Sequence, residues 1–562
     1  MMTYIKKAPN VGIKKINKTK KHEKNTKSAK MPRISTIKAK TSSRREFVKG
    51  LNKLYSQLLA EHKDKSEHLI SELLKLIGDH YRLLIRQKHS TRILQACLKY
   101  GTDEQRQYIY QKIKDEIPYL CMTNHGSHLA IKAYRYCNAD AKKHFEDNII
   151  FSAASLSYLK SRYGSLIWDF IYNKFSMAKQ IGSLLQLLVP TSVKVLKPDL
   201  FDILLKTKNL NQLHAKIACD QELFPKYKEI CVGLFGKLID RHLTNTSISH
   251  DIGYLTCLLA SDDEMDDLAQ RFTQGLDSLY ITKSGVFVAC HLYGYTPPKQ
   301  RKTIVKQLKQ NLEEMATNVA TNLFVSRVLL VTDDTKLTIE HLVKPLGEIT
   351  SKLAFDKYGH KIIVSLANKE ALTLYNGYER EVIRLPSPRS LKEFELRHSQ
   401  LSEAFRTLLL NVLSQNQHQI DVWLKDKYSS LVIESALSKF NLDLFNTISG
   451  AINDKFDGSL GLLDNSTCLH LVQRIIKKLP SDVRETACDN IWNVISPRID
   501  QILMSRSVFL LVSILETVDR SSPVFSSATN LICHDDILKA KSKNSSNCGL
   551  NILEKILFNT QT

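Results

Sequence analysis

Glycine and proline are scarce in this chain, with 20 glycines and 14 prolines among 562 residues. Both residue types weaken the interior of a helix, so their scarcity and an apolar content of 43% indicate an ordered, helix-rich protein. A globular chain of this length would normally divide into several domains, each with its own core. A solenoid escapes that division, because each of its repeats buries its apolar face only against its neighbours.

Other absences exclude whole classes of protein. The 11 cysteines are odd in number and lack zinc spacing, and Cys97, Cys257 and Cys290 lie in apolar helical runs, so we expect buried, reduced thiols. There is no apolar N-terminal signal and no uncharged apolar run of about 20 residues. These absences predict a soluble, intracellular protein that has no membrane partner.

Sequence motifs that carry catalysis are missing as well. The chain contains no GxGxxG, Walker A, HExxH or GxSxG arrangement. We therefore expect no catalytic residue, no cofactor and no metal, and we interpret the chain as a binding protein rather than an enzyme.

Acidic residues are nearly absent from the first 45 positions, which hold 12 Lys and 3 Arg against a single acid, Glu23. The few apolar residues there cannot offset chain entropy by burial, which predicts a disordered basic tail over residues 1–45. Lys-rich stretches such as residues 14–21 favour nuclear or nucleolar localisation and contact with nucleic acid. A tail that only adds solubility is the alternative.

A five-residue frame, a small first residue followed by larger and apolar ones, repeats along the rest of the chain. Its six clearest copies begin at Thr91, Ser127, Ser165, Val286, Asn322 and His360. Both trios are spaced by 36 and 38 residues, and each member of the first lies 195 residues before its counterpart. Such a period indicates one helical unit that stacks on copies of itself. We predict an all-α, right-handed α-solenoid of about eleven repeats, bent in two halves.

The repeat count includes related segments near Ser430, Leu469, Val508 and Leu550, one near Asp251, and a poorly defined unit around residues 200–215. Residues 46–376 are predicted to form the N-terminal repeats and residues 398–562 the C-terminal repeats. Residues 377–397, with two prolines among charged residues, lack the frame and predict a linker or an insertion.

Several segments resemble the Pumilio (PUF) family, in particular the Puf-A type, the nucleolar homologs that end in a CPL region. These segments are Lys88–Gln95 with Tyr100–Arg106, Thr282–Lys302, Asp356–Lys361, Arg506–Glu516 and Gly549–Lys555. The resemblance runs from about residue 46 to the C-terminus. It implies a monomeric solenoid that binds RNA, or DNA, with little sequence preference. It also implies a nucleolar role on pre-ribosomal RNA, beside protein components of the precursor of the large ribosomal subunit.

In PUF proteins the first and fifth residues of the frame meet a base edge, and the second stacks between bases. Only Thr91, Arg92 and Gln95 supply all three kinds of side chain here, and this erosion argues against a long sequence-specific footprint. The incomplete copies contribute Ser127, His128, Ser165, Asp169, Phe287, Asn322, His360 and Lys361. Cations that would contact phosphates include Lys88, Lys132, Arg162 and Lys357.

Each of these features also has a purely structural interpretation. A buried ring is the usual fate of an aromatic residue in a helix, which applies to Phe287, and His360 could pack within a turn. At the level of the whole protein, two other functions stay open. One is a PUF-style repressor of specific messenger RNAs, and the other is a protein-binding scaffold of the HEAT or armadillo kind.

Overall fold

The computed structural model describes residues 34–60, 66–272, 276–437, 441–454, 460–544 and 547–558. Every regular element in these ranges is helical, which confirms the predicted all-α solenoid. The chain divides into two compact units, Met1–Ile113 and Lys114–Thr562. Within the described ranges, no helix combines the length and hydropathy needed to cross a membrane.

The first unit contains the first five helices of the chain. They are α1 (Ile34–Ala60), α2 (Ser66–Ile77), α3 (Tyr81–Ile85), α4 (Lys88–Tyr100) and α5 (Asp103–Ile113). The helix α2 packs against both α1 and α4, and the apolar side chains of Leu73, Ile93 and Leu94 are buried there. The predicted disordered tail is wrong for residues 34–45, because they form the beginning of α1. Residues 1–33 of that tail lie outside the described residues.

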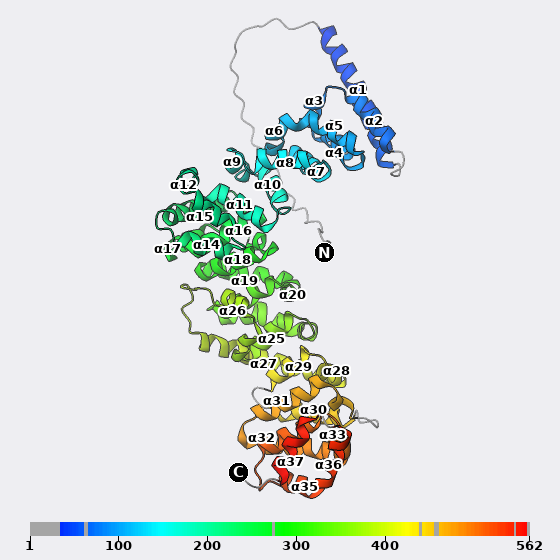
Figure 1. Ribbon diagram of the computed structural model, residues 1–562, viewed down its shortest axis with the longest axis vertical. Coiled ribbons are helices and arrows are strands. Elements are labelled where there is room, and N and C mark those ends of the chain that lie inside the picture. Colours follow the sequence, from blue (N-terminus) through cyan, green and yellow to red (C-terminus); the bar gives the residue numbers. More distant parts are fainter. Residues whose placement is uncertain are drawn as a thin grey trace. The chain divides into compact units, whose positions relative to one another are not determined.

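The second unit is built around a row of helices that occupy the frame position of successive repeats. They are α7 (Asn124–Tyr136), α10 (Gly164–Tyr172), α16 (Ser247–Leu259), α18 (Lys283–Tyr295), α21 (Thr321–Val331), α25 (Gly359–Ala367), α29 (Ser429–Ala436), α31 (Ser466–Lys478), α34 (Val508–Thr517) and α37 (Cys548–Phe558). Each helix contacts the next in chain order, and Figure 1 shows the succession from cyan to red. With α4 of the first unit, eleven such helices lie in the described ranges. The predicted count was about eleven, but it included the unit around residues 200–215, which is not among them.

Shorter and outer helices complete the repeats. Those that precede a frame helix are α6 (Ile117–Met122), α9 (Ser155–Leu159), α15 (Leu223–Asp240), η3 (Leu276–Ile281), α20 (Leu312–Thr317), α24 (Thr350–Leu353), α28 (Ile420–Lys425), η8 (Gly461–Asp464), α33 (Ile499–Met504) and α36 (His534–Lys543). Those that follow one are α8 (Ala139–Ile149), α11 (Met177–Leu188), α17 (Asp262–Arg271), α19 (Pro298–Leu308), α22 (Thr335–Thr338), α23 (Lys344–Glu348), α27 (Phe394–Gln415), α30 (Leu442–Asp454), α32 (Ser481–Ile495) and α35 (Pro523–Leu531).

The unit expected around residues 200–215 does not join the row of frame helices. This region forms α12 (Thr191–Leu196), α13 (Pro198–Leu205) and α14 (Leu210–Ala218), which pack against one another and against α11 and α15. The helices α10 and α16 touch each other directly. The Tyr172 hydroxyl of α10 donates to Asp251 Oδ2 of α16 at 2.6 Å, which ties the two frame helices together.

The segment predicted as a linker or insertion, residues 377–397, is docked on the solenoid. Its helix α26 (Gly377–Ile383) packs against α18 and α21, and the chain then crosses to α27, which packs on α25. The Arg327 guanidinium of α21 donates to the Ile383 carbonyl at 2.9 Å and to the Pro386 carbonyl at 2.7 Å. The segment is therefore an insertion with its own anchoring contacts, and not a free hinge.

The cysteines singled out from the sequence are buried as predicted. Cys97, Cys257 and Cys290 are at most 5% exposed. Burial raises the pKa of the Cys97 and Cys290 thiols to about 12, so both stay protonated at neutral pH.

Arg327→Ala should loosen the insertion and weaken the fold. The change removes a guanidinium that donates to three carbonyl groups, two of them through buried hydrogen bonds, and each unpaired buried acceptor costs roughly 1–3 kcal/mol. We expect the free energy of unfolding to fall by about 3 kcal/mol or more. We also expect trypsin to cleave the folded Arg327→Ala variant after Arg384 or Arg389, faster than it cleaves the unmutated chain. Thermal melting and limited trypsin digestion measure the two effects, with Lys306→Ala on the exposed face of α19 as the control. Unchanged digestion at this segment would contradict the anchoring role.

Candidate nucleic-acid interface

The first residue of the frame is buried wherever the sequence predicted a base contact. The Thr91 hydroxyl donates to the Gln87 carbonyl at 2.6 Å, Ser127 to Asn124 at 2.8 Å and Ser165 to Arg162 at 3.2 Å. Short polar side chains near a helix start often bond to the backbone in this way. The predicted base contacts of these three residues are therefore wrong in this conformation, because their polar atoms face the protein.

The side chains of two further first-position residues also bond to the backbone of the preceding turn. The Asn322 amide donates to the Asn318 carbonyl at 2.7 Å, and His360 Nδ1 lies 2.9 Å from the Asp356 carbonyl. The His360 ring also stacks on Tyr428, with 4.6 Å between ring centroids. Burial lowers the pKa of His360, which keeps the ring neutral. Neither residue is placed to meet a base, and the packing interpretation of His360 is the one that holds.

Asp169, predicted to read a base as the fifth residue of its frame, instead joins two repeats. Its Oδ1 accepts hydrogen bonds from the backbone N–H groups of Ser247 at 2.6 Å and Ile248 at 3.4 Å, at the start of α16. A carboxylate is favoured at a helix N-terminus, where backbone N–H groups lack partners. Burial nevertheless raises the pKa of Asp169 to about 6. The side chain is structural, and the sequence could not show this because α16 lies 78 residues further along the chain.

Exposed cations remain on the frame helix of the first unit. Arg92 and Lys88 are exposed on α4, and Gln95 is half-buried one turn after Arg92. Neither cation forms an ion pair with a described residue. Of the one complete set predicted from the sequence, the stacking residue and the fifth residue are therefore accessible, whereas Thr91 is not.

The second unit carries a basic surface on α7 and at the end of α10. His128 and Arg135 are exposed on α7, and Lys132 is half-buried between them. The Arg135 guanidinium lies 5.1 Å from the centroid of the Phe170 ring, and Lys174 Nζ lies 5.9 Å from it. No acidic side chain among the described residues pairs with these cations. The exposed cations and the aromatic ring are the groups that phosphates and bases contact.

A second group of cations lies around the loop before α10 and includes Lys237 and Arg241 from the end of α15. The Arg241 guanidinium donates to the Lys160 carbonyl at 2.8 Å, and Arg162 is exposed two residues further on. Burial, together with the charges of Lys237 and Arg241, lowers the pKa of Lys160. Like charges in close approach repel unless an anion joins them, so this cluster is suited to phosphate. Lys174, Lys237 and Arg241 escaped the sequence analysis, because they lie outside the frame.

In the middle of the row, the frame residues are covered by the inserted segment. Phe287 and Cys290 of α18, and Leu323 and Ser326 of α21, are at most 6% exposed. Tyr375, which follows η6 (Lys369–Leu374), has its hydroxyl 2.9 Å from Ser326 Oγ. The Phe287 ring packs on Tyr254 with 4.5 Å between centroids. The predicted RNA contact of Phe287 is therefore wrong, because its ring belongs to the core under α26.

A pocket of about 280 Å³ remains beside this covered region, and it brings together Phe287, Lys357 and Lys361. Lys361 Nζ lies 2.8 Å from Glu379 Oε2 of α26, and both side chains are largely buried. This ion pair neutralises Lys361 and holds α26 in place. Lys357 is exposed at the rim, so of these two lysines it is the one that an outside phosphate could reach.

The comparisons agree with this architecture. Residues 80–114, which span α3 to α5, match the family described as the Pumilio-family RNA binding repeat. Pumilio homolog 3 of Homo sapiens is 23% identical over 396 residues, which cover 69% of this chain and 58% of that protein. Pumilio homology domain family member 6 of Schizosaccharomyces pombe is 23% identical over 358 residues, covering 63% of this chain and 54% of that protein. The matches thus span less than 60% of the length of these two relatives.

Among solved structures, human Puf-A superposes with a TM-score of 0.73 at 19% identity, over 92% of this chain and 100% of that one. Human Puf-A in complex with DNA gives a TM-score of 0.70, also at 19% identity, over 91% and 99%. Fold and repeat together define an α-solenoid of the Pumilio type. Within that class the resemblance predicted from the sequence is confirmed, because the chain is similar to Pumilio homolog 3 and shares the fold of human Puf-A.

The buried position of Asp169 predicts a pH-dependent stability. A pKa raised to about 6 means that the folded chain favours the protonated carboxyl. The stability that the folded chain gains from keeping this carboxyl protonated is complete below about pH 4 and is lost as the pH rises through about 6. Asp169→Asn keeps an oxygen acceptor for the Ser247 N–H and does not titrate. From pH 4 to pH 7, we expect the variant to gain about 2–3 kcal/mol of unfolding free energy relative to the native chain. Melting curves across this range test the shift, and parallel pH profiles of the two proteins would contradict it.

Proposed function

We propose that the chain binds RNA mainly through phosphates, with little preference for sequence. The observation that carries the proposal is the contrast along the frame helices. Among the described residues, exposed cations without acidic partners lie on α4 and α7 and on either side of α10, at Arg162 and Lys174, whereas the side chains expected to read base edges are mostly buried. Phosphate contacts fix a protein on nucleic acid but carry no sequence information, so this arrangement binds without discriminating strongly.

We further propose that the chain acts, without catalysis, in assembly of the large ribosomal subunit and in pre-rRNA processing. The support is its similarity to the Puf-A type and the basic composition of residues 1–33. Such a role requires binding to long, varied ribosomal RNA beside other proteins of the particle, and it suits a sequence-tolerant surface. It also implies a nucleolar location, which imaging of a tagged chain with and without residues 1–33 tests; equal nucleolar enrichment of both would remove the tail from this proposal.

The two alternatives fit the side chains less well. A repressor of specific messenger RNAs needs several accessible base-reading sets, and α18 and α21 present none. A protein-binding scaffold does not need the cations on α7 and on either side of α10. Human Puf-A has been solved in complex with DNA, so DNA is included among the nucleic acids that the chain is proposed to bind.

Binding should be steeply salt-dependent and tolerant of sequence. A fragment of ribosomal RNA and a scrambled RNA of equal length should bind within about tenfold of each other, because phosphate contacts dominate. For both RNAs the affinity should fall steeply across a salt series followed by fluorescence anisotropy. A preference above about a hundredfold would contradict the proposal, since specific readout typically adds ~4–10 kcal/mol.

Arg92 should contribute to binding without contributing to the fold. Its side chain is exposed, so Arg92→Ala should weaken RNA binding by about 1–3 kcal/mol through lost stacking and charge, with no change in melting temperature. Lys75→Ala, an exposed cation on α2, is the matched control. Ile93→Ala gives the opposite pattern, because Ile93 is only 2% exposed, and its truncation should cost roughly 2–5 kcal/mol of stability. Equal affinity of the Arg92 and Lys75 variants would remove α4 from the interface.

A further inference from the structure

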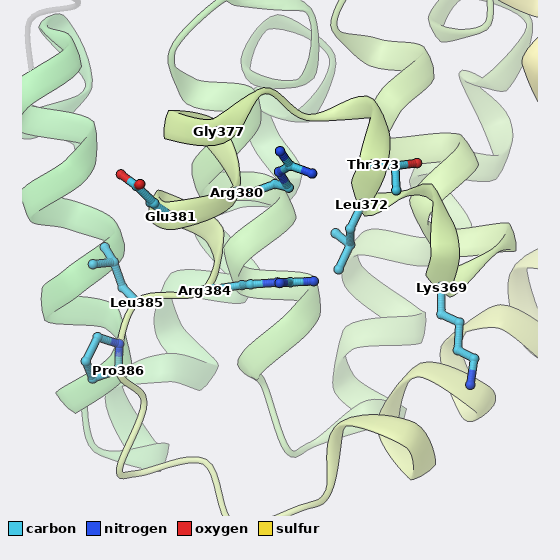
Figure 2. A pocket seen from close by; sticks show the side chains of 9 residues that line it. All are labelled: Lys369, Leu372, Thr373, Gly377, Arg380, Glu381, Arg384, Leu385 and Pro386. Atoms are coloured by element: carbon cyan, nitrogen blue, oxygen red, sulfur yellow. The ribbon is translucent and has the colours of Figure 1, made fainter.

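The inserted segment forms one side of a groove of about 930 Å³ on the outside of the second unit. Figure 2 shows this groove, with residues of η6 on one side and α26 with the chain that follows it on the other. Three cationic side chains line it, Lys369, Arg380 and Arg384, against one carboxylate, Glu381. The lining of the groove includes none of the cations described above on α7 and around α10.

The direction of the two arginines follows from how α26 packs. Glu379, Val382 and Ile383 are the buried residues of this helix, and they face the solenoid. Arg380 and Arg384 are four residues apart, so they lie one turn apart on the same face of the helix, and both are exposed. In Figure 2 both guanidinium groups point to the same side, toward Leu372 and Thr373, while Glu381 points the other way.

The charges of Arg380 and Arg384 are not neutralised within the described residues. Neither guanidinium has an ion pair or a hydrogen bond there. Two acids flank Arg380 in the sequence. Glu379 is engaged by Lys361 at 2.8 Å and by the Asn376 backbone N–H at 2.9 Å, and Glu381 points away from both guanidinium groups. Lys369 pairs with Glu395 at 3.1 Å, but both side chains are more than half exposed, so this ion pair is weak.

The segment that carries these arginines on its outer face also covers frame residues on its inner face. Its inner face lies over Phe287 and Leu323, and its outer face is cationic. Guanidinium groups bind phosphate oxygens through two parallel N–H donors, which makes arginine well suited to a nucleic-acid backbone. An acidic groove would have favoured a different ligand, and here the cations outnumber the one carboxylate.

We propose that this groove is a phosphate-binding site for the RNA backbone, with Arg380 and Arg384 as the contacting residues. The RNA then crosses the middle repeats on the outer face of the insertion instead of on the frame helices. This inference rests on the proposed function, because it requires that the chain binds RNA. The inference gives the position of a phosphate contact. It also gives a reason why the middle repeats cannot read sequence, since the RNA passes over the insertion that covers their frame helices.

The test compares three double variants on an unstructured single-stranded RNA in a salt series. Arg380→Gln with Arg384→Gln removes both charges, and Arg380→Lys with Arg384→Lys retains them. Lys299→Gln with Lys306→Gln, two exposed cations on α19 without ion pairs, removes the same charge outside the groove. The slope of log affinity against log salt should flatten by about 1.4 for the Arg-to-Gln variant, from two contacts at about 0.7 each. The Arg-to-Lys variant should keep most of the native slope, and the α19 variant should also stay close to it.

The outcomes separate the inference from the function on which it rests. If the native chain binds no RNA, the proposed function fails. If the native chain binds RNA and the Arg-to-Gln variant keeps the affinity and slope of the α19 control, the groove is not a phosphate site, while the proposed function stands. If the Arg-to-Gln variant loses binding to polyglutamate but not to RNA, the groove recognises acidic protein and the inference is overturned. Circular dichroism of each variant confirms that the helical fold is intact.

Discussion

The Arg327 guanidinium joins three parts of the chain that are far apart in sequence. It donates to the carbonyls of Cys290 in α18, Ile383 at the end of α26 and Pro386 just beyond. Burial lowers its pKa to about 10, yet it stays charged at neutral pH, and the C-terminal end of α26 favours a cation. The approach is close enough that a Cβ at Gly294 would lie 2.2 Å from the Pro386 carbonyl oxygen. The insertion can dock only because a glycine stands there.

Docking of the insertion explains why the frame is apolar in the middle of the solenoid. Phe287 and Leu323 stand where a stacking residue would be expected, and both are buried beside Val382 of α26. Their apolar side chains therefore provide the surface on which α26 packs. The burial removes these repeats from base recognition, because no base can stack on a side chain that already packs against protein. Accessible cations remain on α4 and α7, on either side of α10, and on the outer face of the insertion.

The frame residues differ in how well their roles could be predicted. The exposure of Arg92 and His128 agrees with the expected second position, because a single amphipathic helix sets which side faces away from the core. The burial of Thr91 and Ser127 was not predicted, because it depends on hydrogen bonds to the preceding turn. The base contact of Asp169 and the RNA contact of Phe287 failed for another reason. The contact of α10 with α16 brings Ser247 to Asp169, and the docking of the insertion brings Val382 to Phe287, and the period of the frame predicts neither.

By itself, the sequence determined the helical class, the period, the approximate number of repeats and the positions of buried residues such as Ile93 and Cys290. These properties follow from local spacing, since apolar side chains at helical intervals must be buried whatever surrounds them. The tertiary structure decided which faces stay open. The packing of α12 to α14 beside the row, the direct contact of α10 with α16 and the docking of α26 all depend on contacts between distant residues. Such contacts set the exposure of a polar or charged side chain, and exposure decides whether that side chain can meet a nucleic acid.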